Sequence, residues 1–191
     1  MDRASVLLVA GPPGAGKSTV GRLVAERFER AVYVESDWFW TTIVGGAVAP
    51  WLPEADAQNQ VVLRACAAAA AAFARGGYPV VMSGIFGPWF LDLVAEECAT
   101  DDVDLHYVIL RPRLEVALER ALSRAPLTAD AAPLREEGPI RQLWDQFQNL
   151  GPRESHVIDN SDEDPGRTAA AVGARWAAGI DRLDGQGRSG P

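Results

Sequence analysis

Short apolar runs alternate along the chain with longer stretches in which apolar residues recur at helical spacing. The runs that predict buried strands are 5–10, 31–35, 79–83, 103–110 and 156–159. The stretches that predict helices are 17–29, 54–75, 88–99, 113–124, 140–150 and 165–183. Strands that alternate with helices in this way predict an α/β fold of three layers, in which helices cover both faces of a five-stranded parallel sheet.

Three segments lack such a pattern. Residues 38–53 are rich in Gly and Pro and are predicted to be irregular. Residues 125–138 are polar and interrupted by prolines, so they are predicted to form a mobile lid. Residues 184–191 are rich in Gly and are expected to be a disordered tail. The remainder, residues 1–183, is predicted to be a single domain.

The first predicted strand runs into a sequence that fits the phosphate-binding pattern G-x-x-x-x-G-K-[ST]. The candidate nucleotide-binding residues are Gly11, Pro12, Pro13, Gly14, Ala15, Gly16, Lys17, Ser18 and Thr19. The glycines allow backbone N–H groups to face phosphate oxygens, and the dipole of the following helix adds to the attraction. We expect Lys17 to bridge the β- and γ-phosphates of ATP and Ser18 to ligate Mg²⁺. The alternative, a Gly-Pro turn with an incidental lysine, is disfavoured by the strand before and the helix after.

Composition adds two constraints. Of the 18 Lys and Arg residues only Lys17 is a lysine, which suggests that a compact ammonium is required there. The net charge of −8 disfavours nucleic acid as a partner. No apolar run spans a bilayer and no signal peptide precedes the first strand, so we expect no membrane partner and a cytoplasmic location. Cys66 and Cys98 are expected to be buried thiols.

Asp37 follows the second predicted strand. Because ligands of parallel sheets bind beyond the carboxyl ends of the strands, Gly11, Asp37 and the Ser83-Gly84 turn are expected to converge. Asp37 is therefore a candidate general base toward an acceptor hydroxyl and a candidate Mg²⁺ ligand through water. The alternative is that Ser36 or Asp37 caps a following helical turn. Glu35 is expected to point to the opposite face of the sheet.

Two further candidates for ATP contact lie on the predicted helix 113–124. Arg124 stands at the threshold of the lid, where it would neutralise charge on the transferring phosphoryl group, and Arg120 precedes it by one turn. The alternative is a solvated basic flank that pairs with glutamates of the same helix. Asn160 lies in a polar loop after the last strand and is a candidate contact of the adenine edge. The alternative for that loop is a turn that caps the final helix.

Together, the phosphate loop, the strand-terminal Asp37, the Gly turn after the third strand and the Arg-bearing lid resemble a kinase family. It is the nucleoside-monophosphate-kinase-like group of small-molecule kinases, which includes shikimate kinase, gluconate kinase, zeta toxins and chloramphenicol phosphotransferase. The resemblance implies that Asp37 is the base or substrate clamp and that Arg124 contacts ATP. The chain lacks the Gly-Gly-Gly run of shikimate kinase after the third strand. It also lacks an Asp at the end of that strand, so that Ser18 and Asp37 would hold Mg²⁺ together with water.

Aromatic residues gather after the second and third predicted strands. The candidate substrate-binding residues are Asp37, Trp38, Trp40, Ser83, Gly84, Phe86 and Trp89. No arginine occurs between Arg30 and Arg64, so this region favours a small, weakly charged acceptor such as an antibiotic or sugar. The alternative is that the rings belong to the core. The sequence thus predicts an ATP-dependent kinase of an alcohol group. A nucleoside or nucleotide kinase and a P-loop ATPase or regulatory nucleotide-binding protein are the alternatives.

Overall fold

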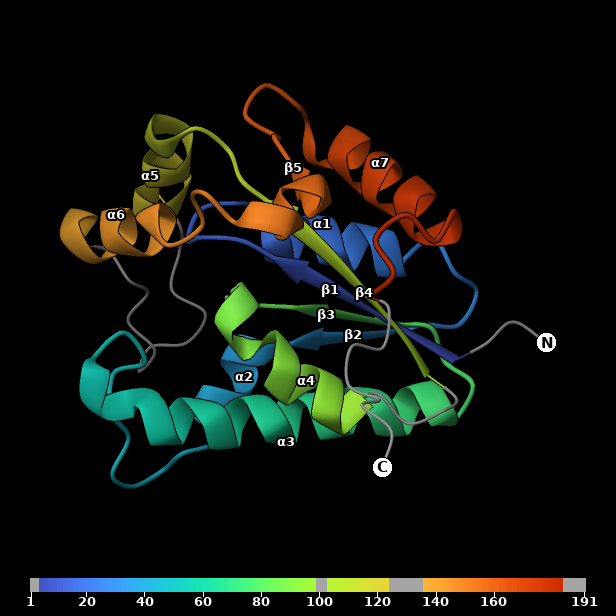
Figure 1. Ribbon diagram of the computed structural model, residues 1–191, viewed down its shortest axis with the longest axis horizontal. Coiled ribbons are helices and arrows are strands. Elements are labelled where there is room, and N and C mark those ends of the chain that lie inside the picture. The colour runs from blue at the N-terminus through green and yellow to red at the C-terminus, as the bar shows by residue number, and fades with distance from the viewer. Residues whose placement is uncertain (1–3, 99–102, 124–135, 184–191) are drawn as a thin grey trace.

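The computed structural model describes residues 4–98, 103–123 and 136–183. Its centre is a sheet of five strands in the order β2-β3-β1-β4-β5, and every pair of neighbours is parallel. The strands are β1 (Ala4–Ala10), β2 (Val32–Glu35), β3 (Val80–Ser83), β4 (Val103–Leu110) and β5 (Val157–Ile158). The predicted five-stranded parallel sheet is therefore confirmed (Figure 1).

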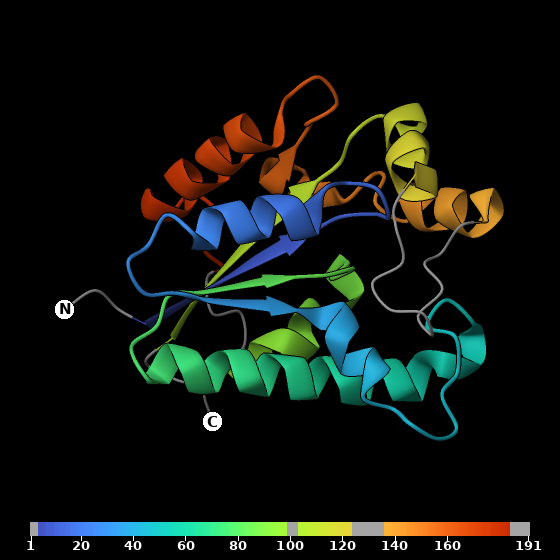
Figure 2. The same cartoon turned by 180° about the vertical axis from the view of Figure 1, so that it is seen from behind.

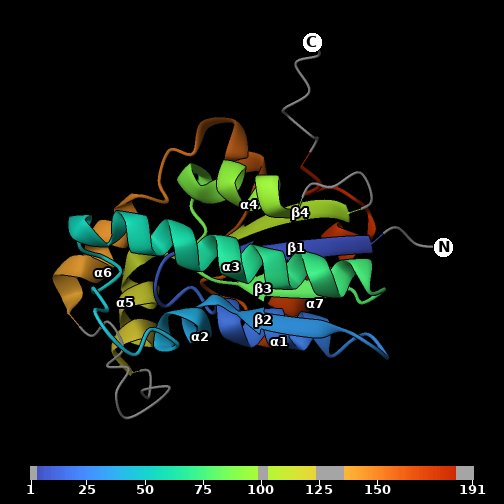
Figure 3. The same ribbon diagram turned by 90° about the horizontal axis from the view of Figure 1, so that it is seen from below.

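Helices cover both faces of this sheet. They are α1 (Lys17–Ala25), α2 (Ser36–Thr41), α3 (Asp56–Arg75), α4 (Leu91–Cys98), α5 (Leu114–Ser123), α6 (Glu137–Asp145) and α7 (Pro165–Ala177), with the short 3-10 helices η1 (Pro53–Ala55), η2 (Pro88–Phe90) and η3 (Gly151–His156). Helices α1 and α7 lie on one face (Figures 1 and 2). Helices α3 and α4 lie on the other, where α3 runs the length of the sheet (Figure 3).

Alternation along the strands builds a separate core on each face. Val6, Leu8 and Ala10 of β1 point toward α3 and α4, where the alanines of α3 allow the helix to lie close to the sheet. Leu7 and Val9 point the other way and pack against α1 and α7. All five side chains are completely buried. Because β1 is central and covered on both sides, it reads as a continuous apolar run rather than an alternating one.

Several segments differ from the prediction. The first helix ends at Ala25 rather than at residue 29, and the helix predicted over 140–150 spans Glu137–Asp145. Residues 38–40 were expected to be irregular, but they belong to α2. Their three consecutive aromatic residues carry no helical period, so the pattern could not reveal a six-residue helix. The final helix ends at Ala177 rather than at residue 183, with Gly179 in the left-handed region at φ 68°.

After α7 the chain returns to the sheet. The backbone N–H of Tyr107 in β4 donates to the carbonyl of Asp181, and the N–H of Leu183 donates to the carbonyl of Leu105. An antiparallel bridge joins His106 to Arg182. This segment therefore covers the part of β4 that the two-residue β5 leaves open.

Some of the remaining predictions concern segments that the structure describes only in part or not at all. Most of the proposed lid and the whole of the proposed tail lie outside the described residues, and the described end of the lid segment belongs to α6, which begins at Glu137. Cys66 and Cys98 are buried free thiols, as expected. None of the helices in the described ranges is long and apolar enough to cross a membrane.

Candidate active site

The segment between β1 and α1 forms a tight loop at the carboxyl edge of the sheet. Gly11, Gly14 and Gly16 all adopt positive φ angles, of 145°, 75° and 86°. A β-carbon on Gly11 would collide with the carbonyl oxygen of Leu110 at the end of β4, and one on Gly14 would collide with the carbonyl oxygen of Ala117 in α5. Gly11 and Gly14 are thus required because the loop is packed against β4 and α5, whereas Gly16 is favoured by its positive φ.

Helix α1 begins at Lys17, directly after the left-handed Gly16. Its first N–H groups have no acceptors within the helix, so they and the positive end of the helix dipole are available to an anion. The Nζ atom of Lys17 lies across the loop and donates to the carbonyl of Pro12 at 2.8 Å. An ammonium group, unsatisfied helix N–H groups and a loop that bends around them fit the phosphate chain of a nucleoside triphosphate.

Asn160, which follows β5, supports this loop from the other side. Its Nδ2 donates to the carbonyl of Ala15 at 2.9 Å, and the side chain is only 3% exposed. The Nη2 of Arg120 in turn donates to the carbonyls of Asn160 and Ser161, at 3.3 and 3.4 Å. The final helix is capped not by this loop's Asn160 but by Asp164, whose side chain accepts from two backbone N–H groups of α7. The two sequence candidates Asn160 and Arg120 therefore form one chain of contacts beneath the phosphate loop.

Arg113, directly before α5, is engaged in ion pairs. Arg113 binds Asp162 through both terminal nitrogens, at 2.8 and 2.7 Å. Its exposed guanidinium keeps the pKa of Asp162 below the usual value, chiefly through these hydrogen bonds. Arg113 therefore joins α5 to the loop after β5. Arg124 lies outside the described residues, and its predicted contact with ATP stays a prediction.

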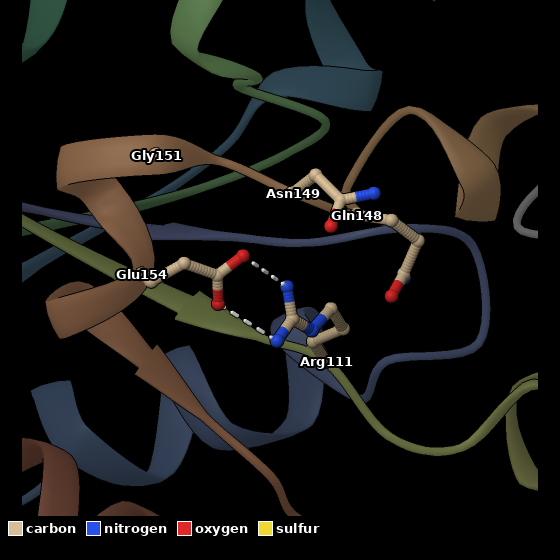
Figure 4. A pocket seen from close by; sticks show the side chains of 5 residues that line it. All are labelled: Arg111, Gln148, Asn149, Gly151 and Glu154. Atoms are coloured by element: carbon tan, nitrogen blue, oxygen red, sulfur yellow. Dashed lines mark hydrogen bonds and ion pairs between the residues drawn. The ribbon is translucent and has the colours of Figure 1, made fainter.

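A second ion pair, between Arg111 and Glu154, lines a pocket beside the end of β4 (Figure 4). Arg111 meets Glu154 of η3 in two parallel hydrogen bonds of 3.0 and 2.9 Å and also donates to the carbonyl of Phe147. Gln148, Asn149 and Gly151 complete the lining. Because the guanidinium is already held on two sides, Arg111 anchors the connection from α6 to η3.

Asp37 lies in the first turn of α2, at the carboxyl end of β2, and is half-buried. The capping alternative fails in the form in which it was stated, because the N-cap is Glu35 and its side chain makes no capping hydrogen bond. The Oγ of Ser36 is buried without a partner. A carboxylate in the first turn is favoured by the helix dipole, and α2 holds that of Asp37 at the carboxyl edge of the sheet.

The predicted acceptor residues divide into two groups. Ser83 and Phe86 are fully buried, and Gly84 is pressed against Ser36 so closely that a β-carbon there would collide with the serine Oγ. The turn after β3 is thus packed between the sheet and its neighbours in this structure, and the assignment of these three residues to an acceptor pocket stays a prediction. The hydroxyl of Tyr107 fixes this turn by donating to the carbonyl of Phe86 at 2.7 Å.

The three tryptophans remain candidates for the acceptor side. Trp38 and Trp89 are each 46% exposed. Trp40 is half-buried, and its Nε1 donates to Oδ1 of Asn59 in α3 at 2.9 Å. Trp89 packs edge-on against Phe147, with ring centroids 5.5 Å apart. Exposed indoles that follow β2 and β3 provide stacking surfaces at the edge of the sheet that carries the phosphate loop.

A family model described as an AAA domain matches residues 6–150 of this chain. The chain belongs to the AAA domain family. This AAA domain protein is 48% identical over 48 residues to the shikimate kinase of Psychrobacter cryohalolentis, a match that covers 25% of this chain and 24% of that kinase. The chain thus matches about a quarter of the length of that relative.

Solved structures extend the likeness to almost the whole AAA domain chain. The tunicamycin resistance protein of Deinococcus radiodurans superimposes with a TM-score of 0.64 at 16% identity, covering 95% of this chain and 99% of that one. The shikimate kinase of Acinetobacter baumannii in complex with shikimate gives 0.58 at 22%, with coverages of 94% and 95%. A gluconokinase of Sinorhizobium meliloti 1021 gives 0.62 at 22%, with coverages of 94% and 97%. The chain therefore has a kinase-like P-loop fold, and the predicted resemblance is confirmed.

Proposed function

We propose that this protein is an ATP-dependent phosphotransferase that moves the γ-phosphoryl group to a hydroxyl of a small, weakly charged molecule. The observation that carries the proposal is the geometry of the phosphate loop together with Asp37. The loop presents Lys17 and the N-terminus of α1 to a phosphate chain, and Asp37 stands at the carboxyl end of β2, two strands away on the same edge of the sheet.

Each residue then has a defined task. Asp37 takes the proton of the acceptor hydroxyl as its oxygen forms a bond to the γ-phosphorus, and the bond from that phosphorus to the β-γ bridging oxygen breaks to leave ADP. Lys17 offsets the charge on the β- and γ-phosphates. Mg²⁺ supplies further charge neutralisation, and Ser18 with Asp37 would hold it. No group of three or more His, Cys, Asp or Glu side chains gathers within the described ranges, so phosphate oxygens and water would complete the coordination.

The acceptor is proposed to be weakly charged because of what surrounds it. No Lys or Arg occurs between Arg30 and Arg64, or between Arg75 and Arg111. These two stretches contain α2, the first part of α3 before Arg64, and the turn after β3, which form the side of the site opposite α5 and α6. The exposed faces of Trp38 and Trp89 suit a sugar ring or an aromatic alcohol. The names of the similar proteins, which include a gluconokinase and a tunicamycin resistance protein, support a search among sugars and antibiotics.

The test is ADP release with ATP and Mg²⁺ across a panel of hydroxylated compounds, with shikimate, gluconate, neutral sugars, nucleosides, chloramphenicol and tunicamycin included. We expect one class of neutral alcohol to accelerate ADP release and to gain a phosphoryl group by mass spectrometry. Lys17→Ala, prepared in parallel, identifies any contaminating activity. ATP hydrolysis that ignores every compound would instead favour a regulatory ATPase. Acceleration by nucleosides alone would favour a nucleoside kinase.

A further inference from the structure

Residues 179–183 follow α7 and form a strap along β4, away from the candidate active site (Figure 1). Two backbone hydrogen bonds, of 2.9 and 2.8 Å, join the strap to Tyr107 and Leu105 of β4. Between them, an antiparallel bridge joins His106 to Arg182. Because β5 pairs with β4 only near the carboxyl end of that strand, the strap covers edge positions that would otherwise be open.

The chain has two histidines, and both lie against this strap. His106 forms the bridge to it, and Nδ1 of His156 lies 3.3 Å from Oδ1 of Asp181. Asp181 is completely buried, and Arg175 donates to both of its carboxylate oxygens. Histidine is the side chain whose charge ordinarily changes between about pH 5 and 8. A segment that contacts both histidines is therefore placed to respond to pH in this range.

The surroundings of His106 suit a neutral imidazole. The residue is 6% exposed, and its Nδ1 has no hydrogen-bond partner among the described residues. On the α7 side its ring packs edge-on against Trp176, with ring centroids 6.3 Å apart. On the β1 side its register partner is Leu7. These two neighbours bring no carboxylate to the ring.

The charged groups that act on His106 are Asp104 of its own strand and Asp181 and Arg182 of the strap. Both carboxylates are already engaged with arginines, because Asp104 pairs with Arg182 at 3.1 Å and Asp181 pairs with Arg175. Burial lowers the pKa of His106 below its ordinary value, although the two carboxylates act in the opposite direction. A proton on His106 is therefore disfavoured while the strap covers it.

The direction of the pH dependence follows from this difference. When the strap leaves β4, His106 becomes exposed and regains a pKa of about 6.5. The docked strap therefore keeps the full contribution of the neutral imidazole above about pH 6.5 and loses it progressively as the pH falls. His156 acts in the opposite sense, because a proton on its ring would turn its contact with Asp181 into an ion pair.

We propose that the strap is a pH-sensitive latch, which lies on β4 while His106 is neutral and is released when His106 is protonated in mildly acidic solution. Release uncovers the backbone groups of β4 at 105–107, an edge to which another strand can pair. The inference is independent of the proposed function, because it involves neither the phosphate loop nor the acceptor side.

Hydrogen–deuterium exchange of the full chain, followed from about pH 7.5 to about pH 5.5, tests the latch. Protection is expressed relative to the intrinsic exchange rate at each pH, so that only opening of the structure is compared. In the wild type we expect protection of the Tyr107 and Leu183 amides to fall several-fold. The limit is about 10-fold over this range, because one histidine with a pKa of about 6.5 in the open state is titrated. Amides of β1 should lose less protection.

His106→Gln removes the titrating group, so its strap should keep a constant protection over the same range. His106→Phe serves the same purpose if the glutamine variant does not fold. The matched control is His156→Gln, which removes the other histidine at the same strap and should retain the fall. The inference would be overturned if the wild-type strap were equally protected at both ends of the range, if β1 lost as much protection as the strap, or if the fall persisted without His106.

Discussion

The contact between Asn160 and the phosphate loop allows a direct measurement of how the loop is held. Asn160→Ala removes the Nδ2 that donates to the carbonyl of Ala15 at 2.9 Å. Both residues are buried, Asn160 to 3% exposure and Ala15 to 0%, so water does not readily replace the lost donor. We expect the variant to fold and to bind nucleotide more weakly.

The magnitude follows from two opposing changes. A buried carbonyl left without its donor costs about 1–3 kcal/mol. The substitution also removes Oδ1 of Asn160, which is buried without a partner in the wild type and whose loss is favourable. The net loss is therefore expected in the lower part of the range, about 1–2 kcal/mol of unfolding free energy. For a domain of this size that loss corresponds to a decrease in melting temperature of about 2–8 °C.

The same energy limits the effect on binding. If the whole loss falls on the conformation of the loop, nucleotide affinity decreases by about 5-fold to 30-fold. Calorimetric titration with both ATP and inorganic tripolyphosphate tells where Asn160 acts. If Asn160 supports the loop, its removal should weaken the binding of both ligands by the same factor. If Asn160 contacts the adenine edge, as the sequence suggested, its removal should weaken the binding of ATP alone.

Asn59→Ala provides the matched control for Asn160→Ala. Asn59 is 9% exposed and its side chain also holds a backbone carbonyl, that of Pro50, at 2.7 Å. It lies in α3, away from the phosphate loop, so it should lose stability without losing affinity for tripolyphosphate. The reasoning would be refuted if Asn160→Ala bound tripolyphosphate as tightly as the wild type, or if Asn59→Ala weakened it equally.

Three further predictions concern charge. Lys17→Ala and Lys17→Arg should both abolish acceptor-dependent ADP release while the circular dichroism spectrum stays unchanged. The arginine variant should fail because a guanidinium is too broad for the position of the ammonium. Wild-type turnover in either variant would remove Lys17 from the mechanism. Asp37→Asn should lower kcat by about 100-fold or more with little change in ATP affinity, as measured by steady-state kinetics and calorimetry. If added Mg²⁺ restored part of the lost activity, Asp37 would instead be a metal ligand. Burial disfavours the ionised form of Asp181, but its bonds to Arg175 and His156 outweigh this and keep its pKa below the usual value. Asp181→Asn should therefore lower the unfolding free energy by about 3 kcal/mol at pH 7. The difference should shrink below about pH 4, because the unfolded wild-type chain then binds a proton at Asp181 while the native carboxylate, with its lower pKa, stays ionised to lower pH. A difference that stays constant with pH in denaturant titrations would contradict this.

The sequence predicted the strands well and the connections between them poorly. The apolar runs that became β1, β3 and β4 are bounded by Gly, Pro or charged residues, so their limits are local signals. The strand β5 proved only two residues long, because Gly151–His156 turns as a 3-10 helix just before it. Such a boundary depends on how η3 is anchored by Arg111 and Glu154, which are separated by 43 residues. No local pattern contains that information.

The candidate site shows the same division. The phosphate loop was predicted because its chemistry is encoded in consecutive residues. The support from Asn160 was not, because it contacts a residue 145 positions away. Glu35 was expected to turn away from the site, and its link to Ser83 arises from the order β2-β3-β1, which brings two strand ends together under α1.

Lys17 gives the protein a chemical handle. It is the sole lysine of the chain, and its amine already lies across the phosphate loop, 2.8 Å from the carbonyl of Pro12. A nucleotide that carries an amine-reactive acyl group therefore has one side chain to modify, and the modification reports directly on occupancy of the loop. Intact-mass spectra would count loaded molecules without proteolysis, and a competing ligand would be recognised by the protection that it gives. Because the chain has a single lysine, labelling of Lys17 thus measures how much of the phosphate loop is occupied.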